Sequence, residues 1–360
     1  MRSTTILALA VALAASLVAP VAAQSPSMSP PADGSSLRMA ASFVPPGAPD
    51  LAFTDWARIR ASLGAEDVTG ASSLDDKSEV VLSTVRGEAA ASGFGVAYLR
   101  RHRDTWGWDT LDVDWEATLS VDGPPVHVVR LRDGVDTDAI SARYDELGFA
   151  TEQVGDAVVR TQPLDLASEW IGTTELAVVN TAFLDDGRTL LLSSGREGLD
   201  QVLSGARAAV SPPLDGVLDA LDGASAAWIA TAPDCLAFTP LPLDPFDPDA
   251  SIGPLPSGEP LHPWAAMGIG YQRPDWKPAG RIAMGFLDEG HANADLEPRS
   301  TMARDGISPR AGRPFSEAVF TLDGARVEDT TLVLEVSPVD DIATRLFQMV
   351  YARDMPFAGC

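Results

Sequence analysis

Apolar residues recur along this chain at spacings that predict short strands and short helices in alternation. The β-branched run Val126–Leu131 predicts a strand. Apolar residues at helical spacing then predict a helix that begins at Asp136, a capping residue type, and ends at Gly148. Another helix is expected directly after Thr54 or Asp55, which are also capping types. This mixture of elements predicts an α+β fold.

Two segments share the same order of predicted elements. Residues 182–203 and 319–347 each contain a strand, an Asp-Gly turn, a second strand, a serine and an amphipathic helix. In the second segment the turn is expected at 322–324, and Ser194 and Ser337 are expected to cap the two helices. We therefore expect two related β-α-β-β-α halves, similar in order to a ferredoxin-like split βαβ unit. The sheets should be mainly antiparallel, with helices on one face.

Residues 1–23 predict a secretory signal peptide. A positive start, Met1-Arg2, precedes the apolar run Ile6–Val18, and Val21-Ala22-Ala23 supplies the small residues of a cleavage site. The apolar run is too short to span a bilayer. Gln24 stands where a lipoprotein would need a cysteine. We therefore expect a secreted or extracytoplasmic protein, in the periplasm or at the cell surface, without a lipid anchor.

Composition divides the rest of the chain. Residues 24–48 are rich in Ser, Pro and Ala and predict a flexible tether. A first α+β domain is expected over 49–235 and a second over 264–360. Between them, 236–263 is expected to be a linker, because its part from Thr239 to Pro263 holds eight prolines.

Charge and cysteine content narrow the choice of partners. The chain has 51 acidic and 26 basic residues, a formal net charge of −25, and a field of that sign repels nucleic acid and anionic lipid headgroups. After the signal peptide no stretch approaches 18 uninterrupted apolar residues, so we expect no membrane insertion. The two cysteines, Cys235 and Cys360, predict a disulfide formed in an oxidising compartment.

The common cofactor and nucleophile motifs are missing from the sequence. Neither lysine, Lys77 or Lys277, follows a glycine, which excludes a P-loop. There is no Rossmann glycine pattern and no Gly-x-Ser-x-Gly motif. The four histidines are far apart in the sequence and form no His-x-x-x-His pair. We therefore expect no cofactor and no metal site, and we expect each histidine to be a surface or packing residue.

One stretch gathers aromatic and acidic residues. It supplies seven candidate ligand-binding residues: Trp106, Trp108, Asp109, Asp112, Asp114, Trp115 and Glu116. From Leu111 onward apolar and acidic positions alternate, which predicts a strand with three of the carboxylates on one face, about 6.5–7 Å apart. The simplest interpretation is an amphipathic strand whose acidic side is solvated. Two others stay open: a carbohydrate site with exposed Trp rings that stack on sugars, and a calcium site.

These observations favour a non-enzymatic function. We expect a secreted binding or interaction protein of the bacterial cell envelope, whose partner is a glycan or an envelope protein. The alternative is an extracellular hydrolase that acts on polymers such as glycans through paired carboxylates among Asp109, Asp112, Asp114 and Glu116. Burial discriminates between them, because an enzyme needs two of these carboxylates in a cleft with perturbed pKa values. The pattern carries no indication of oligomeric state.

Overall fold

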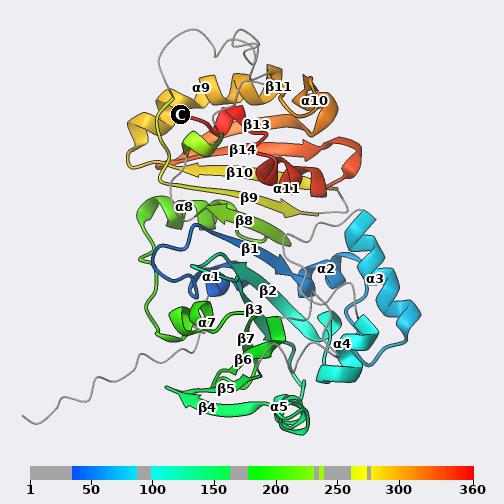
Figure 1. Ribbon diagram of the computed structural model, residues 1–360. Coiled ribbons are helices and arrows are strands. Elements are labelled where there is room, and N and C mark those ends of the chain that lie inside the picture. Colours follow the sequence, from blue (N-terminus) through cyan, green and yellow to red (C-terminus); the bar gives the residue numbers. More distant parts are fainter. Residues whose placement is uncertain (1–34, 87–98, 163–176, 231–234, 239–260, 274–276) are drawn as a thin grey trace, which may run out of the picture.

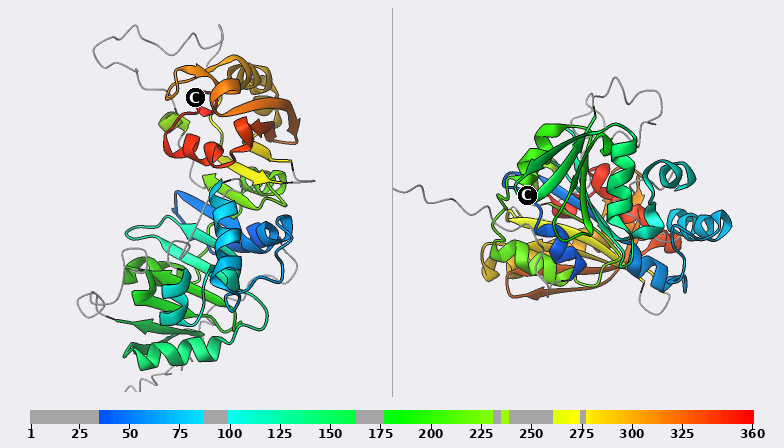
Figure 2. Two further views of the ribbon diagram at one scale, coloured as in Figure 1. Left: turned by 90° about the vertical axis from the view of Figure 1, so that its right-hand side faces the viewer. Right: turned by 90° about the horizontal axis from the view of Figure 1, so that it is seen from below.

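The computed structural model describes residues 35–86, 99–162, 177–230, 235–238, 261–273 and 277–360. The predicted signal peptide, the first part of the predicted tether and most of the predicted linker lie outside the described residues. Within them, one large sheet forms the body of the molecule (Figure 1). Its strands succeed one another along the long axis of the molecule (Figure 2).

Twelve strands make up this sheet: β1 (Asp50–Asp55), β2 (Val113–Leu119), β3 (Val126–Leu131), β4 (Ala150–Val154), β5 (Ala157–Thr161), β6 (Asn180–Phe183), β7 (Thr189–Ser193), β8 (Ala226–Ala230), β9 (Ala266–Gln272), β10 (Ala279–Gly285), β13 (Phe320–Glu328) and β14 (Thr331–Pro338). A separate small ladder pairs β11 (Ile307–Ser308) with β12 (Arg313–Pro314).

The described helices are α1 (Ser36–Ala41), α2 (Trp56–Ser62), α3 (Leu74–Arg86), α4 (Leu99–Trp106), α5 (Thr137–Glu146), α7 (Arg196–Leu203), α8 (Pro212–Ala220), α9 (Glu289–Asp305), α10 (Phe315–Ala318) and α11 (Thr344–Tyr351). Short 3₁₀ turns cover Thr110–Asp112, Cys235–Phe238, Val339–Asp341 and Pro356–Ala358.

The strand order in the sheet is β13-β14-β10-β9-β8-β1-β2-β3-β7-β6-β5-β4. Each neighbouring pair in this order is antiparallel. The expectation of an α+β protein with a mainly antiparallel sheet is therefore confirmed.

The strand orders on the two sides of the β1–β8 pair correspond to each other. One side reads β1-β2-β3-β7-β6, and the other reads β8-β9-β10-β14-β13. The first side carries an additional hairpin, β4-β5, between α5 and β6. The sheet also continues across the predicted linker 236–263, because β8 before it pairs with β9 after it.

Helices cover both faces of the sheet, so the expectation of helices on one face is wrong. On β14, Val333 packs in the same apolar cluster as Val217 of α8. Its neighbours Leu332 and Leu334 pack in another cluster with Leu346 of α11. Successive strand residues point to opposite faces, so α8 and α11 lie on opposite sides. The prediction failed because these strands are apolar on both faces, a pattern that needs two covering layers.

The predictions of one strand and of two helix-capping residues are confirmed. Val126–Leu131 is β3, and Asp136 accepts a hydrogen bond from the backbone N–H of Ala139 at the start of α5. Asp55 caps α2 in the same way through the N–H of Arg58.

The predicted elements near the C-terminal hairpin are partly wrong. Residues 322–324 form no turn: they are an irregularity within β13, whose pairing with β14 shifts between Leu322 and Gly324. The chain turns instead at Asp329, which has a φ of 52°. Ser337 lies within β14, one residue before its end, and does not cap a helix, since α11 begins only at Thr344. Ser194 is not a cap either, because Gly195 holds that position in α7.

Candidate functional site

The three tryptophans of the predicted cluster are buried and lie in different parts of the core. Trp106, Trp108 and Trp115 expose 0%, 1% and 2% of their surface. Trp106 and Trp108 pack on one face of the sheet with Tyr144. Trp115 packs on the other face with Phe53, their ring centroids 6.3 Å apart. None of these rings is placed to stack on a sugar without local opening of the core.

Trp106 and Trp108, the first two residues of the predicted cluster, pack against other aromatic rings. Its ring centroid lies 5.0 Å from that of Tyr144 and 5.8 Å from that of Phe149. His102 meets the Trp108 ring edge-on at 4.6 Å. Burial lowers the pKa of the His102 imidazole to about 3, so this ring is neutral at physiological pH. The sequence expectation of a packing histidine describes His102 well.

Asp109 is fully buried and is paired with a lysine. Its Oδ2 lies 2.7 Å from Nζ of Lys77, which also donates to the backbone oxygen of Gly70 at 3.1 Å. Its Oδ1 accepts the N–H of Leu111 at 2.9 Å. Burial raises the pKa of Asp109, and the hydrogen bond from Lys77 opposes that rise.

Asp112 lies in the 3₁₀ turn before β2, not in the strand as predicted. It accepts hydrogen bonds from the backbone N–H groups of Gly70 and Asp109, at 3.0 and 3.1 Å, and is ion-paired with Arg103. Asp109 and Asp112 thus cap the turn reciprocally. A Cβ at Gly70 would lie 2.1 Å from Asp112 Oδ2, so a larger residue here would displace the Asp112 carboxylate from its present position.

The two remaining carboxylates of the cluster do lie on β2. Asp114 is partly exposed and bonds to Arg188 at 2.7 Å, with Arg60 a further 3.6 Å contact. Glu116 is buried opposite Thr54 of β1 and Val129 of β3. Of the three carboxylates predicted to share one strand face, β2 thus carries two, Asp114 and Glu116. The sequence missed the basic partners of three of the carboxylates: Lys77 and Arg188 lie 32 and 74 positions away, and Arg103, nine positions before Asp112, belongs to the neighbouring helix α4.

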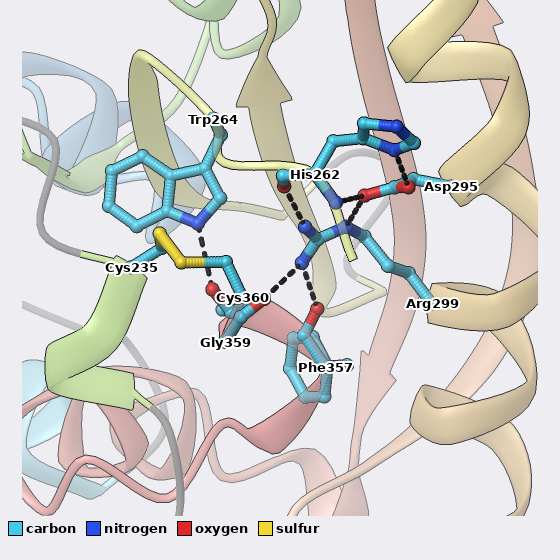
Figure 3. Close-up of a disulfide and its surroundings, with 9 residues drawn as sticks. Cys235, His262, Trp264, Asp295, Arg299, Phe357, Gly359 and Cys360 are labelled. Atoms are coloured by element: carbon cyan, nitrogen blue, oxygen red, sulfur yellow. Dashed lines mark hydrogen bonds and ion pairs between the residues drawn. A yellow bond between two sulfur atoms is a disulfide. The ribbon is translucent and has the colours of Figure 1, made fainter. Parts of the chain in front are cut away.

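A second polar group, which the sequence did not indicate, surrounds Arg299 of α9 (Figure 3). The buried guanidinium donates to Oδ2 of Asp295 at 2.8 Å and to the backbone oxygen of His262 at 2.6 Å. It also donates to the backbone oxygens of Phe357 and Gly359, at 2.6 and 3.1 Å. Arg299 therefore ties the last residues of the chain to α9.

The predicted disulfide closes this region. Cys235, in the 3₁₀ turn after β8, is bonded to Cys360, 125 positions later. Beside it, the indole N–H of Trp264 donates to the backbone oxygen of Ala358 at 2.8 Å (Figure 3). The prediction of a Cys235–Cys360 bond is confirmed.

His262 lies at the rim of the Arg299 group. Its Nδ1 lies 2.7 Å from Asp295 Oδ1, and its backbone N–H donates to Oδ2 at 3.0 Å. The ring stacks on His291 of α9, with centroids 4.1 Å apart. No local spacing could reveal the pair formed by His262 and Asp295, since 33 positions separate them.

Among the helices that the structure describes, none combines the length and the hydrophobicity that a membrane span requires. Nor do three or more His, Cys, Asp or Glu side chains gather as metal ligands in the part of the chain that the structure covers.

Comparison with known proteins gives a distant structural likeness. No known protein family matches the sequence, and no curated protein matches it. Four solved chains match. Crystal form I of TP0453 has a TM-score of 0.37 and 9% identity, and covers 87% of this chain and 97% of that one. Forms III and IV each have a TM-score of 0.39 and 10% identity; they cover 87% and 86% of this chain and 97% and 95% of theirs. Likeness at this level carries no conclusion about function.

Proposed function

We propose that this protein is an exported, non-enzymatic binding or interaction protein of the bacterial cell envelope. The observation that carries the proposal is that the clustered carboxylates form ion pairs with basic residues of the protein itself. Asp109, Asp112 and Asp114 are each held by a basic side chain, and two of them also hold backbone N–H groups. Carboxylates engaged in this way contribute to the fold, which supports a structural role for the cluster over a catalytic one.

Export is supported by two independent features. The N-terminal pattern predicts a signal peptide, and the Cys235–Cys360 disulfide is typical of proteins that fold in an oxidising compartment.

The alternative of a hydrolase has less support. A glycosidase needs two carboxyl groups facing the substrate, one of them protonated near neutral pH. Burial does raise the pKa of Asp109. The neighbouring Lys77 ammonium group nevertheless occupies the position from which Asp109 would deliver a proton.

A related proposal concerns the origin of the fold. We propose that the halves β1-β2-β3-β7-β6 and β8-β9-β10-β14-β13 descend from one duplicated unit of the split βαβ kind. Their matching strand order supports this. In the second half, α9 follows β10 and precedes β13 in the chain while β14 lies between those strands in the sheet, and this order supports the proposal of a split βαβ unit.

The edge strand β4 is the surface that we assign to an envelope-protein partner. All of its residues except Val154 are exposed, and within the described sheet it pairs only with β5. An unpaired strand edge accepts an extended peptide by adding one more strand.

A photo-crosslinking experiment tests this function. A crosslinking amino acid replaces Gln153 on β4, and in a matched control it replaces exposed Asp138 on α5. We expect one discrete adduct with an envelope protein from position 153 and none from position 138. Absence of an adduct at 153, or turnover of a glycan polymer that Asp109→Asn abolishes, would overturn the proposal.

A further inference from the structure

Acidic side chains surround β4, the edge strand beside α5 (Figure 1). Helices flank this end of the sheet on opposite faces, since Leu191 of β7 packs with α7 while its neighbours Leu190 and Leu192 pack with α5. In α5 and its cap, the β4-β5 hairpin and α7, the acidic residues are Asp136, Asp138, Asp145, Glu146, Glu152, Asp156, Glu197 and Asp200, and the basic residues are Arg143, Arg160 and Arg196.

Each of these arginines is already paired within the group. Arg143 lies 2.5 Å from Glu146, and Arg160 lies 2.5 Å from Asp145. Arg196 is shared between two carboxylates of the α7 face, as described below. The exposed side chains of Asp138, Asp156 and Glu197 add further negative charge. This end of the sheet therefore carries an excess of negative charge around an open strand edge.

Glu152 is the central residue of β4 and contacts α7. It accepts a hydrogen bond from the Arg196 guanidinium at 2.9 Å, and the same guanidinium donates to Asp200 at 2.6 Å. Two carboxylates thus share one positive charge. The Glu152 side chain is 60% exposed, so it remains accessible to a neighbouring strand.

The centre of β4 disfavours a second copy of this chain as the added strand. Two copies of β4 paired antiparallel about their central residues would place one Glu152 beside the other. Like charges directly opposite each other on neighbouring strands destabilise the pairing. Charged residues on edge strands also keep sheets from joining edge to edge. A strand with a basic residue at that place would instead be attracted.

We propose that the segment that adds to β4 is an extended basic peptide of a partner protein, with Lys or Arg beside Glu152. This inference rests on the proposed function and names the chemistry of the partner. Backbone hydrogen bonds hold an added strand whatever its sequence, and the side chains beside those of the edge strand give specificity. Opposite charges on neighbouring strands attract, and the surrounding negative charge speeds the encounter.

Two synthetic peptides test the charge preference on the purified full chain. Both are extended sequences of Thr and Val; one carries lysines at alternate positions, and the other carries glutamates at the same positions. Fluorescence anisotropy should show that the lysine peptide binds at least about tenfold more tightly. Added NaCl should reduce this difference, because salt screens exposed charges. With the crosslinking amino acid at position 153 the lysine peptide should form an adduct, and with it at position 138 it should form none.

A charge reversal locates the preference on β4. Glu152→Arg should reverse it, so that the glutamate peptide binds more tightly. Glu328→Arg is the matched control: Glu328 lies on β13, the other edge strand of the described sheet, is 55% exposed and is also paired with an arginine. This control changes the net charge equally and should keep the preference of the wild type. Reversal by both variants would mean that overall charge selects the peptide, and it would overturn the inference.

The outcomes separate this inference from the proposed function. Equal binding of both peptides would overturn the basic preference and leave the proposed function standing, because β4 would still accept a strand. Absence of binding by the lysine peptide would overturn the inference even where an envelope protein is crosslinked at position 153. That adduct tests the function itself, whatever the charge of the partner.

Discussion

Lys77 is one of two lysines in the chain, and it is buried against Asp109. Removing two charges from water costs free energy, which their mutual attraction offsets only when further hydrogen bonds satisfy both groups. Here the Gly70 oxygen and the Leu111 N–H supply those bonds. The pair joins α3 to the turn that begins β2.

Replacing either Lys77 or Asp109 should therefore destabilise the protein. We expect Lys77→Met or Asp109→Asn alone to lower the free energy of unfolding by about 3–5 kcal/mol, because each leaves a buried group without its counter-ion or donor. Combining Lys77→Met with Asp109→Asn should lower the free energy of unfolding by less than the sum of the two single effects, because the two residues contact each other. Urea unfolding measures both effects.

Lys277→Met supplies the control for this prediction. Lys277 is exposed, so its replacement should change the free energy of unfolding by less than about 0.5 kcal/mol. Equal effects at positions 77 and 277 would contradict a structural role for the buried pair.

The sequence could predict residue roles that act over three or four positions. Asp55 and Asp136 cap their helices as expected, because each reaches a backbone N–H three residues ahead. The partners of Asp109 and His262 lie 32 and 33 positions away. Such pairs exist only after the chain has folded, so the acidic stretch looked solvated although much of it is buried.

Contacts between elements overrode local signals in the C-terminal part of the sheet. The Asp-Gly pair at 323–324 is a favourable turn sequence, yet β13 continues through it as an irregularity and pairs with β14 on both sides. Backbone pairing along the whole hairpin outweighs the local preference for a turn at that position. The same pairing extends β14 to Pro338 and delays the start of α11 to Thr344.

The approach of α8 to the end of β10 gives a prediction at the element scale. A Cβ at Gly285 would lie 2.3 Å from the backbone oxygen of Pro213, and a backbone atom cannot rotate away. We expect Gly285→Ala to lower the free energy of unfolding by about 1–3 kcal/mol, the usual cost of overpacking. Urea unfolding measures it.

Gly290→Ala is the matched control. Gly290 lies in the first turn of α9, and the nearest contact of an added Cβ is the Asp288 Oδ1 atom at 3.1 Å. Alanine favours helix over glycine by up to about 1 kcal/mol, so this variant should be neutral or stabilised. A Gly285→Ala protein as stable as Gly290→Ala would rule out the close approach.

At the scale of the whole molecule, the fold class could be predicted and the assembly of the sheet could not. Alternation and turn residues indicated mixed strands and helices with antiparallel pairing. The pairing of β1 with β8 joins residues 50–55 to residues 226–230 and unites the two sides of the sheet. No local pattern specifies that contact, because it depends on two distant strands that both have apolar faces to cover.

The Cys235–Cys360 bond is the covalent counterpart of this long-range assembly. It closes a loop between positions 125 apart, worth about 4–5 kcal/mol in the chain-entropy account of disulfides. We expect the double variant Cys235→Ser, Cys360→Ser to unfold at a lower urea concentration, with a free energy of unfolding about 4–5 kcal/mol lower.

The variant should still fold, because Arg299 and Trp264 hold the backbone of the last residues through hydrogen bonds. The variant should therefore keep the near-ultraviolet circular dichroism of the native protein in the absence of urea. Wild-type protein reduced with dithiothreitol should unfold at the same urea concentration as the variant. If both samples instead had the urea midpoint of the oxidised wild-type protein, the disulfide would not stabilise the fold.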